Sequence, residues 1–137
     1  MALDINLDMQ EYLKGRLEEL LQQEDMLFSE LKPSGIPERA GVYLISNNSS
    51  EPYYVGRTKN LRQRLYNNHL MGSLTNACLK KYLIDNGVVS DKEEAKTFIL
   101  QNCKVRWIFE DDYRKRGALE GYFKGIFFPK YGIDEEH

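Results

Sequence analysis

Cysteine is scarce in this sequence, with only Cys78 and Cys103 among 137 residues. The two lie far apart, and neither belongs to a spacing that is typical of metal ligands. We therefore expect both to be small buried hydrophobic residues, with a disulfide bond as the alternative. The chain also lacks a long apolar run, and Met1–Asp8 has neither the basic start nor the apolar stretch of a secretory signal. These absences argue against a membrane protein and favour the cytoplasm, or the nucleus if the source is eukaryotic.

The chain has little net charge, −2 at pH 7, but the charge is distributed unevenly. Residues 1–36 contain eight acidic and three basic side chains, and residues 37–137 contain thirteen acidic and sixteen basic ones. The acidic excess therefore lies in the N-terminal segment, and the remainder is only mildly basic. Any binding to phosphate would have to use a local patch and not the field of the whole molecule.

The N-terminal segment carries an apolar stripe that predicts an amphipathic helix from about Met9 to Lys32. Its apolar residues recur mostly at three- and four-residue steps: Met9, Leu13, Leu17, Leu20, Leu21, Leu27, Phe28 and Leu31. Pro33–Pro37 then predicts a break, because proline and glycine interrupt helices. We divide the chain into an acidic N-terminal helix with its break, residues 1–36, and a body, residues 37–137. The stripe could cover the core or pair with a second copy, or its acidic face could shield a basic groove or bind a protein partner.

The stretch from Gly41 to His69 predicts a hairpin followed by a helix. Gly41–Ser46 is rich in β-branched and aromatic residues, Asn47–Ser50 has the composition of a turn, and Pro52–Val55 would return antiparallel to the first strand. Asn60 is placed to cap a helix over Leu61–Asn68. Two tyrosines on the strands and an arginine on this helix could therefore meet in one pocket.

The rest of the chain predicts further helices and one strand. We expect helices from Leu74 to Asn86, from about Asp91, and from Asp111 to about Phe128, where Pro129 stops the last one. Lys104–Phe109 has the pattern of a half-buried strand. The prediction is an α+β fold with a small three-stranded antiparallel sheet that is flanked by helices and preceded by the amphipathic helix.

A set of motifs in this body resembles the GIY-YIG nuclease family. Gly41-Val42-Tyr43 is followed eleven residues later by Tyr54-Val55-Gly56, and Arg64 comes eight residues after that glycine. A late helix contains Ala118-Leu119-Glu120 and ends at Pro129. The resemblance covers about Pro37 to Tyr131 and implies the fold described above. Taken alone, each of these residues would be interpreted as packing or as solvated surface.

The resemblance implies a role for each matching residue. Tyr43 would deprotonate the attacking water directly or through a second water, and Tyr54 would position water and phosphate. Arg64 would contact the scissile phosphate, and Glu120 would hold one divalent metal, Mg²⁺ or Mn²⁺. These roles suit phosphodiester cleavage, because a guanidinium and a metal ion stabilise the charge that grows on the phosphoryl oxygens.

The sequence departs from the family pattern in two places. Family members often carry His, Tyr or Lys one helical turn after the arginine, where this chain has Asn68. His69 comes one residue late, and an irregular helix end could still bring it into the site. Many members also have an asparagine a few residues after the last proline, where this chain has Lys130-Tyr131-Gly132.

The implied function is that of a metal-dependent endonuclease that acts on duplex or branched DNA. RNA is not excluded as a substrate. Basic residues near the site would grip phosphates without reading bases. They are Arg57, Lys59, Arg62, Lys80 and Lys81. The alternatives are an inactive GIY-YIG fold that binds nucleic acid or protein, and a structural protein that dimerises through its N-terminal helix.

Overall fold

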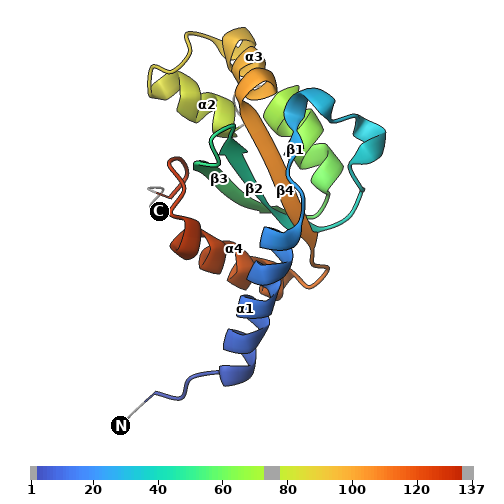
Figure 1. Cartoon of the computed structure of the whole chain (residues 1–137), viewed down its shortest axis with the longest axis vertical. Coiled ribbons are helices and arrows are strands. Elements are labelled where there is room, and N and C mark those ends of the chain that lie inside the picture. Colours follow the sequence, from blue (N-terminus) through green and yellow to red (C-terminus); the bar gives the residue numbers. More distant parts are fainter. Residues whose placement is uncertain (1–2, 73–77, 134–137) are drawn as a thin grey trace.

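The computed structural model describes residues 3–72 and 78–133, and within these ranges the chain forms one antiparallel sheet covered by helices on both faces (Figure 1). The strands are β1 (Met26–Leu27), β2 (Gly41–Asn47), β3 (Pro52–Thr58) and β4 (Cys103–Phe109), in the order β1-β4-β2-β3. The fold class and the three predicted strands are confirmed. The two-residue strand β1 adds a fourth strand at one edge, and β3 forms the other edge.

The helices follow the sequence signals closely at their starts. They are α1 (Leu7–Gln22), the π-helix η3 (Gln63–Leu70), α2 (Cys78–Asp85), α3 (Lys92–Asn102) and α4 (Tyr113–Phe127), with two short 3₁₀ turns at Phe28–Glu30 and Pro33–Gly35. Asn6, Asp91 and Asp112 cap α1, α3 and α4 with their side-chain oxygens. The predicted start of α2 at Leu74 lies outside the described residues. None of the described helices is long and apolar enough to cross a lipid bilayer.

The predicted N-terminal helix is wrong beyond Gln22. The apolar stripe does not mark this end, because Leu27 lies seven residues after Leu20, a spacing that a helix also allows. Met26 and Leu27 instead pair with β4, and Phe28 enters the core. Asp25 forms ion pairs with Arg106 and Lys104 at N···O distances of 3.2 and 3.8 Å. Pairing with the sheet therefore replaces helix in this segment.

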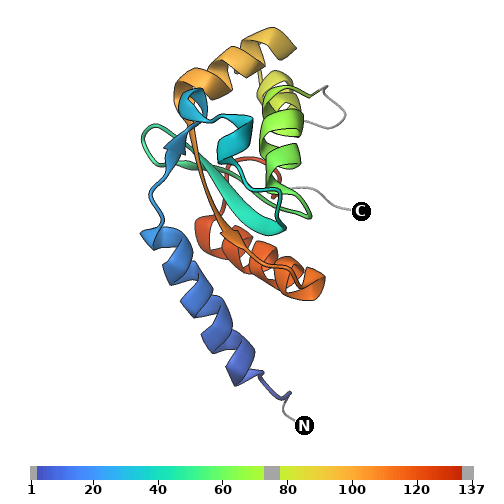
Figure 2. The ribbon, with the colours of Figure 1, turned by 90° about the vertical axis from the view of Figure 1, so that its right-hand side faces the viewer.

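The sheet separates two hydrophobic cores. On one face Tyr43, Ile45 and Trp107 pack with the buried side chains of η3, α2 and α3. On the other face Val42, Leu44 and Val55 pack with buried residues of α1 and α4. Figure 2 shows the ribbons of these two helices beside the sheet. Residues alternate between the faces because side chains alternate along a strand. Any site that uses side chains from both faces must lie at a sheet edge.

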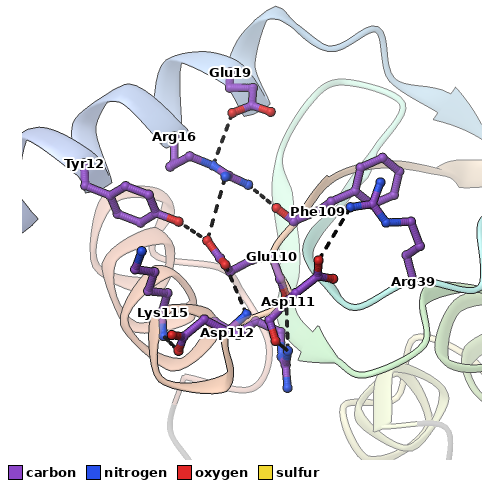
Figure 3. A network of polar contacts seen from close by, with 10 residues as sticks. Tyr12, Arg16, Glu19, Arg39, Phe109, Glu110, Asp111, Asp112 and Lys115 are labelled. Carbon is purple, nitrogen blue, oxygen red and sulfur yellow. Dashed lines mark hydrogen bonds and ion pairs between the residues drawn. The ribbon is translucent and has the colours of Figure 1, made fainter.

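The helix α1 is attached to the body by polar as well as apolar contacts (Figure 3). Tyr12 hydrogen-bonds to Glu110, and Arg16 donates to the carbonyl of Phe109. Leu20 is completely buried in the second core. The apolar stripe of α1 thus covers the core of its own chain, whereas the predicted homodimer or protein partner on this helix stays a prediction.

Cys103 is a free, buried thiol. Burial in apolar surroundings raises the pKa of Cys103 to about 12. It is therefore the small buried hydrophobic residue that the sequence predicted, and the alternative of a disulfide is wrong.

Candidate active site

Tyr43 is placed by the pairing of β2 with β3. Its register partner on β3 is Gly56, and a Cβ atom on this glycine would clash with the Tyr43 hydroxyl. The missing side chain of Gly56 therefore makes the room into which the phenol extends. Only glycine at position 56, in the second tripeptide, leaves space for the Tyr43 side chain.

The Tyr43 hydroxyl lies between a cation and an imidazole. Arg64 Nε donates a hydrogen bond to the Tyr43 oxygen at 3.2 Å, and His69 Nε2 lies 2.7 Å from the same oxygen. Tyr43 and His69 are completely buried. The phenol can thus accept from Arg64 and donate to His69 at the same time.

His69 reaches Tyr43 because its helix is wound as a π-helix. Over Gln63–Leu70 the backbone bonds run from residue i+5 to residue i, as in the bond from Met71 N to Tyr66 O of 2.9 Å at the end of η3. Residues five apart, such as Arg64 and His69, therefore lie on one side of the helix, where an α-helix would align residues four apart. The winding compensates for the one-residue displacement seen in the sequence.

His69 is held in its neutral form. Burial, with a smaller effect from the positive charges of Arg64 and Lys80, lowers the pKa of His69 well below its ordinary value. Within the described part of the chain, Nδ1 of this ring has no hydrogen-bond partner. A neutral imidazole can accept the Tyr43 proton at Nε2.

Tyr54 completes an aromatic cluster around this hydroxyl. The centroid of its ring lies 6.3 Å from that of Tyr43 and 5.1 Å from that of His69. Gly132, with φ of +86°, lies against the Tyr54 ring, and a Cβ there would be 3.0 Å from the nearest ring carbon. A larger residue at this position would need the Tyr54 ring to move.

Glu120 approaches the same edge strand from the other face of the sheet. Its carboxylate is 22% exposed and forms ion pairs with Arg57 of β3 at 3.7 Å and with Lys124 at 4.0 Å. Arg57 directly follows Gly56, so the carboxylate and the Tyr43 hydroxyl flank neighbouring residues of β3.

The residues present fit a single Mg²⁺ or Mn²⁺ ion that is held by one carboxylate. Among the described residues, no three His, Cys, Asp or Glu side chains are grouped as a metal cage. Mg²⁺ commonly takes only one or two protein carboxylates, because water and phosphate oxygens complete its octahedron. Glu120 has a partly exposed carboxylate, which is the kind of group that such an ion takes as a ligand.

The five predicted phosphate-binding residues have different environments. Arg57 and Lys59 line an open pocket, and Lys81 is exposed on α2. Arg62 contacts its own chain, since it donates to Ile36 O at 2.8 Å and pairs with Glu38 at 3.2 Å. These contacts make Arg62 a structural residue in this state.

Lys80 is buried, with 3% exposure, close enough to His69 for its charge to affect the imidazole. Its Nζ donates to Gly72 O at 3.2 Å, and burial lowers its pKa. This lysine supports the end of η3 and is less suited to contact a long phosphate backbone. The predicted role of all five residues in binding phosphate stays a prediction.

Sequence reasoning missed two residues near Arg57. Tyr113 and Arg116 of α4 line the same pocket as Arg57 and Lys59. The helical spacing of three residues shows that both lie on one side of α4, but only the tertiary packing of α4 on β3 brings them to these cations.

The fold and this cluster define a class of protein, a small α+β catalytic domain with its site at an edge hairpin. Residues 39–131, more than half of the chain, match the family model described as the GIY-YIG catalytic domain. The chain belongs to the GIY-YIG family and carries a nuclease domain of this type, as the resemblance predicted.

Known relatives agree with this assignment. The UvrABC system protein C of Rickettsia africae is 37% identical over 66% of this chain and 18% of that protein. The same-named protein of a Synechococcus species is 27% identical over 83% of this chain and 16% of its own length. The chain thus spans less than a fifth of these relatives.

A solved structure with a similar fold is the GIY-YIG N-terminal endonuclease domain of UvrC from Thermotoga maritima, bound to magnesium as its catalytic divalent cation. It is 23% identical, covers 72% of this chain and 88% of its own, and has a TM-score of 0.46.

Proposed function

We propose that this chain is a metal-dependent endonuclease domain that hydrolyses phosphodiester bonds in DNA and leaves a 5′-phosphate. One observation carries the proposal, the position of the Tyr43 hydroxyl between Arg64 Nε at 3.2 Å and His69 Nε2 at 2.7 Å. A phenol has a pKa near 10 and is a poor base at pH 7 unless its neighbours favour the phenolate. Here a cation stabilises the phenolate, and a neutral imidazole accepts the proton.

In the proposed reaction, the Tyr43 oxygen takes a proton from the attacking water while its own proton passes to His69 Nε2. The resulting hydroxide attacks phosphorus, the bond to the 3′-oxygen breaks, and this oxygen takes a proton from solvent, so that the products are a 5′-phosphate and a 3′-hydroxyl. Arg64 stabilises the negative charge that develops on the phosphoryl oxygens, and Tyr54 restricts the position of water and phosphate. A divalent ion held by Glu120 would add electrostatic stabilisation of the same charge when bound.

The catalytic unit in this proposal is residues 37–137, and residues 1–36 form a supporting N-terminal segment. The family match over residues 39–131 supports this division. This chain spans less than a fifth of the length of these relatives, so the UvrABC system that their name refers to is no part of the proposal.

The test is nicking of a supercoiled plasmid by the purified chain with Mg²⁺ or Mn²⁺. We expect Glu120→Ala and Arg64→Ala each to lower the rate by roughly 10²- to 10³-fold, since each removes a group that stabilises transition-state charge. Lys14→Ala, which removes an exposed charge on α1, serves as the matched control and should cleave like the wild type. Equal residual cleavage by wild type and Glu120→Ala across metals and substrates would leave the alternative, an inactive binding module.

A further inference from the structure

A second pocket lies beside the candidate active site, and the reaction proposed above does not use it. It has a volume of about 390 Å³ and is lined by Arg57, Thr58, Lys59, Tyr113 and Arg116. This volume falls in the range of ligand sites, roughly 300 to 1,000 Å³. Three of the five lining side chains are cations and one is aromatic.

The cations in this pocket are held in place or directed toward it. Arg116 is 6% exposed, and its Nη1 donates to the carbonyls of Glu110 at 3.1 Å and Asp111 at 2.7 Å. Arg57 pairs with Glu120 at 3.7 Å, which ties the pocket to the proposed metal ligand. An anion in the pocket would therefore meet pre-positioned positive charge next to the carboxylate of Glu120.

The carboxylates of the acidic residues that precede Tyr113 are bonded to groups outside the pocket lining (Figure 3). The Asp112 carboxylate accepts from the backbone N–H groups of Arg114 and Lys115, and these bonds lower its pKa. Asp111 pairs with Arg39 at 3.9 Å, and Glu110 binds Tyr12 of α1. The carboxylates at the start of α4 are thus engaged with other groups, and the charge that lines the pocket is positive.

Tyr113 is an exposed aromatic residue, with 71% of its surface accessible, at the rim of this basic pocket. Exposed rings beside cations are the usual stacking platforms for the bases of single-stranded nucleic acid. A base inside a duplex cannot stack on a protein ring unless it leaves its neighbours. The combination suits a nucleotide whose base is unpaired.

We propose that this pocket binds one unpaired nucleotide of a DNA strand adjacent to the cleavage position, with its phosphate on Arg57 and Lys59, beside the buried charge of Arg116, and its base on Tyr113. The inference rests on the proposed nuclease function and narrows its substrate to DNA that has a single-stranded or branched segment. Backbone contacts by themselves would bind any DNA, whereas stacking on Tyr113 selects strands that present a free base.

The test is fluorescence anisotropy with a labelled single-stranded oligothymidylate, a duplex of equal length and inorganic polyphosphate as competitor, all in EDTA so that no cleavage occurs. Tyr113→Ala should weaken single-strand binding by about 5- to 100-fold and leave duplex and polyphosphate binding within about twofold. Tyr113→Phe, which keeps the ring, should bind like the wild type. Phe128→Ala removes an equally exposed ring at the other end of α4 and should also have no effect.

A second pair of variants, Lys59→Ala and its control Lys14→Ala, tests the charged part of the pocket. Lys59→Ala should weaken binding of all three probes and reduce the salt dependence of single-strand binding by about 0.7 in log–log slope, whereas Lys14→Ala should not. Unchanged single-strand binding by Tyr113→Ala, or an equal loss for polyphosphate, would overturn the proposal. Binding that depends on Tyr113 in a protein that never nicks DNA would refute the nuclease and retain the pocket. A protein that nicks DNA but whose single-strand binding does not depend on Tyr113 would refute the pocket and retain the nuclease.

Discussion

At the scale of single residues, the central feature is the hydroxyl oxygen of Tyr43, which both Arg64 and His69 contact. Tyr43 accepts from Arg64 and faces His69 Nε2, and all three polar groups lie in or beside a buried core. Hydrogen bonds in such surroundings are stronger than in water, and the imidazole is kept neutral by its burial. The pH behaviour of the protein should therefore report on His69.

The stability of the protein should depend on pH through His69. Its pKa is lowered in the folded state, so between that value and about 6.5 the unfolded chain binds the extra proton. The contribution of His69 to stability is complete above about pH 6.5 and is lost as the pH falls below it, by at most about 1.4 kcal/mol per pH unit. Urea unfolding of the wild type and His69→Gln at pH 5 to 8 measures this, and the variant should lose less stability on acidification. Parallel curves for the two proteins would contradict a buried neutral histidine.

The sequence predicts most of this cluster and leaves the part played by His69 open. Tyr43, Tyr54 and Arg64 follow from the hairpin, the turn and the capped helix, because these local signals determine which strand faces and which helix turn meet. His69 depends on the hydrogen-bond pattern of η3, which residue spacing alone cannot reveal. A pattern written for an α-helix puts Asn68 in its place.

At the scale of elements, the π-helix is the unusual feature. Such segments occur where one residue has been inserted into an α-helix, and they are found frequently at functional sites. Here the extra residue turns His69 toward Tyr43 and leaves Asn67 exposed. If the extra residue were removed, an ordinary α-helix should therefore bring the histidine to Tyr43 without π-helical winding.

Deletion of Asn67 tests this interpretation. The shortened segment should wind as an α-helix, in which the histidine is four residues after Arg64 and again faces Tyr43. We expect the variant to nick DNA at a rate within about tenfold of the wild type, because its histidine again reaches Tyr43. A histidine that did not reach Tyr43 would lower the rate by about 10²-fold or more. His69→Ala in the full-length helix, the matched comparison, should lose at least about 10²-fold. A deletion variant that circular dichroism shows to be folded but that is as inactive as His69→Ala would contradict the interpretation that the π-helix serves to bring His69 to Tyr43.

The ends of elements were predicted less well than their existence. The stripe from Met9 to Leu31 suggested one long helix, yet the chain leaves α1 after Gln22 and forms β1 at Met26–Leu27. Phe28 then packs on the opposite face of the sheet from Leu20. Apolar periodicity could not separate these segments, since both bury the same types of side chain.

At the scale of the whole molecule, the site lies where the two cores meet at an edge strand. The face with η3 brings Arg64 and His69, and the face with α4 brings Glu120 and Tyr113 to the same strand β3. No sequence pattern joins Tyr113 or Arg116 to Arg57, because their proximity depends on how α4 packs across the sheet. The N-terminal helix supports this arrangement through the second core.

The supporting role of α1 predicts a large loss of stability from one substitution. Leu20→Ala leaves a cavity in a completely buried position and should lower the free energy of unfolding by about 2 to 5 kcal/mol. Leu21→Ala, at a neighbouring position that is 52% exposed, should change it by less than about 1 kcal/mol. Chemical denaturation of both variants measures the difference. Similar small effects at both positions would indicate that α1 is a detachable appendage and not part of the core.

The most direct test of the central claim is the single-turnover nicking rate of Tyr43→Phe with saturating Mg²⁺. The substitution removes only the hydroxyl that Arg64 and His69 contact and keeps the buried ring, so the fold should persist. The account predicts that the rate falls by about 10²- to 10⁴-fold, as expected for the loss of a general base, while DNA binding in EDTA is unchanged. A Tyr43→Phe protein that nicks DNA at the wild-type rate would contradict it.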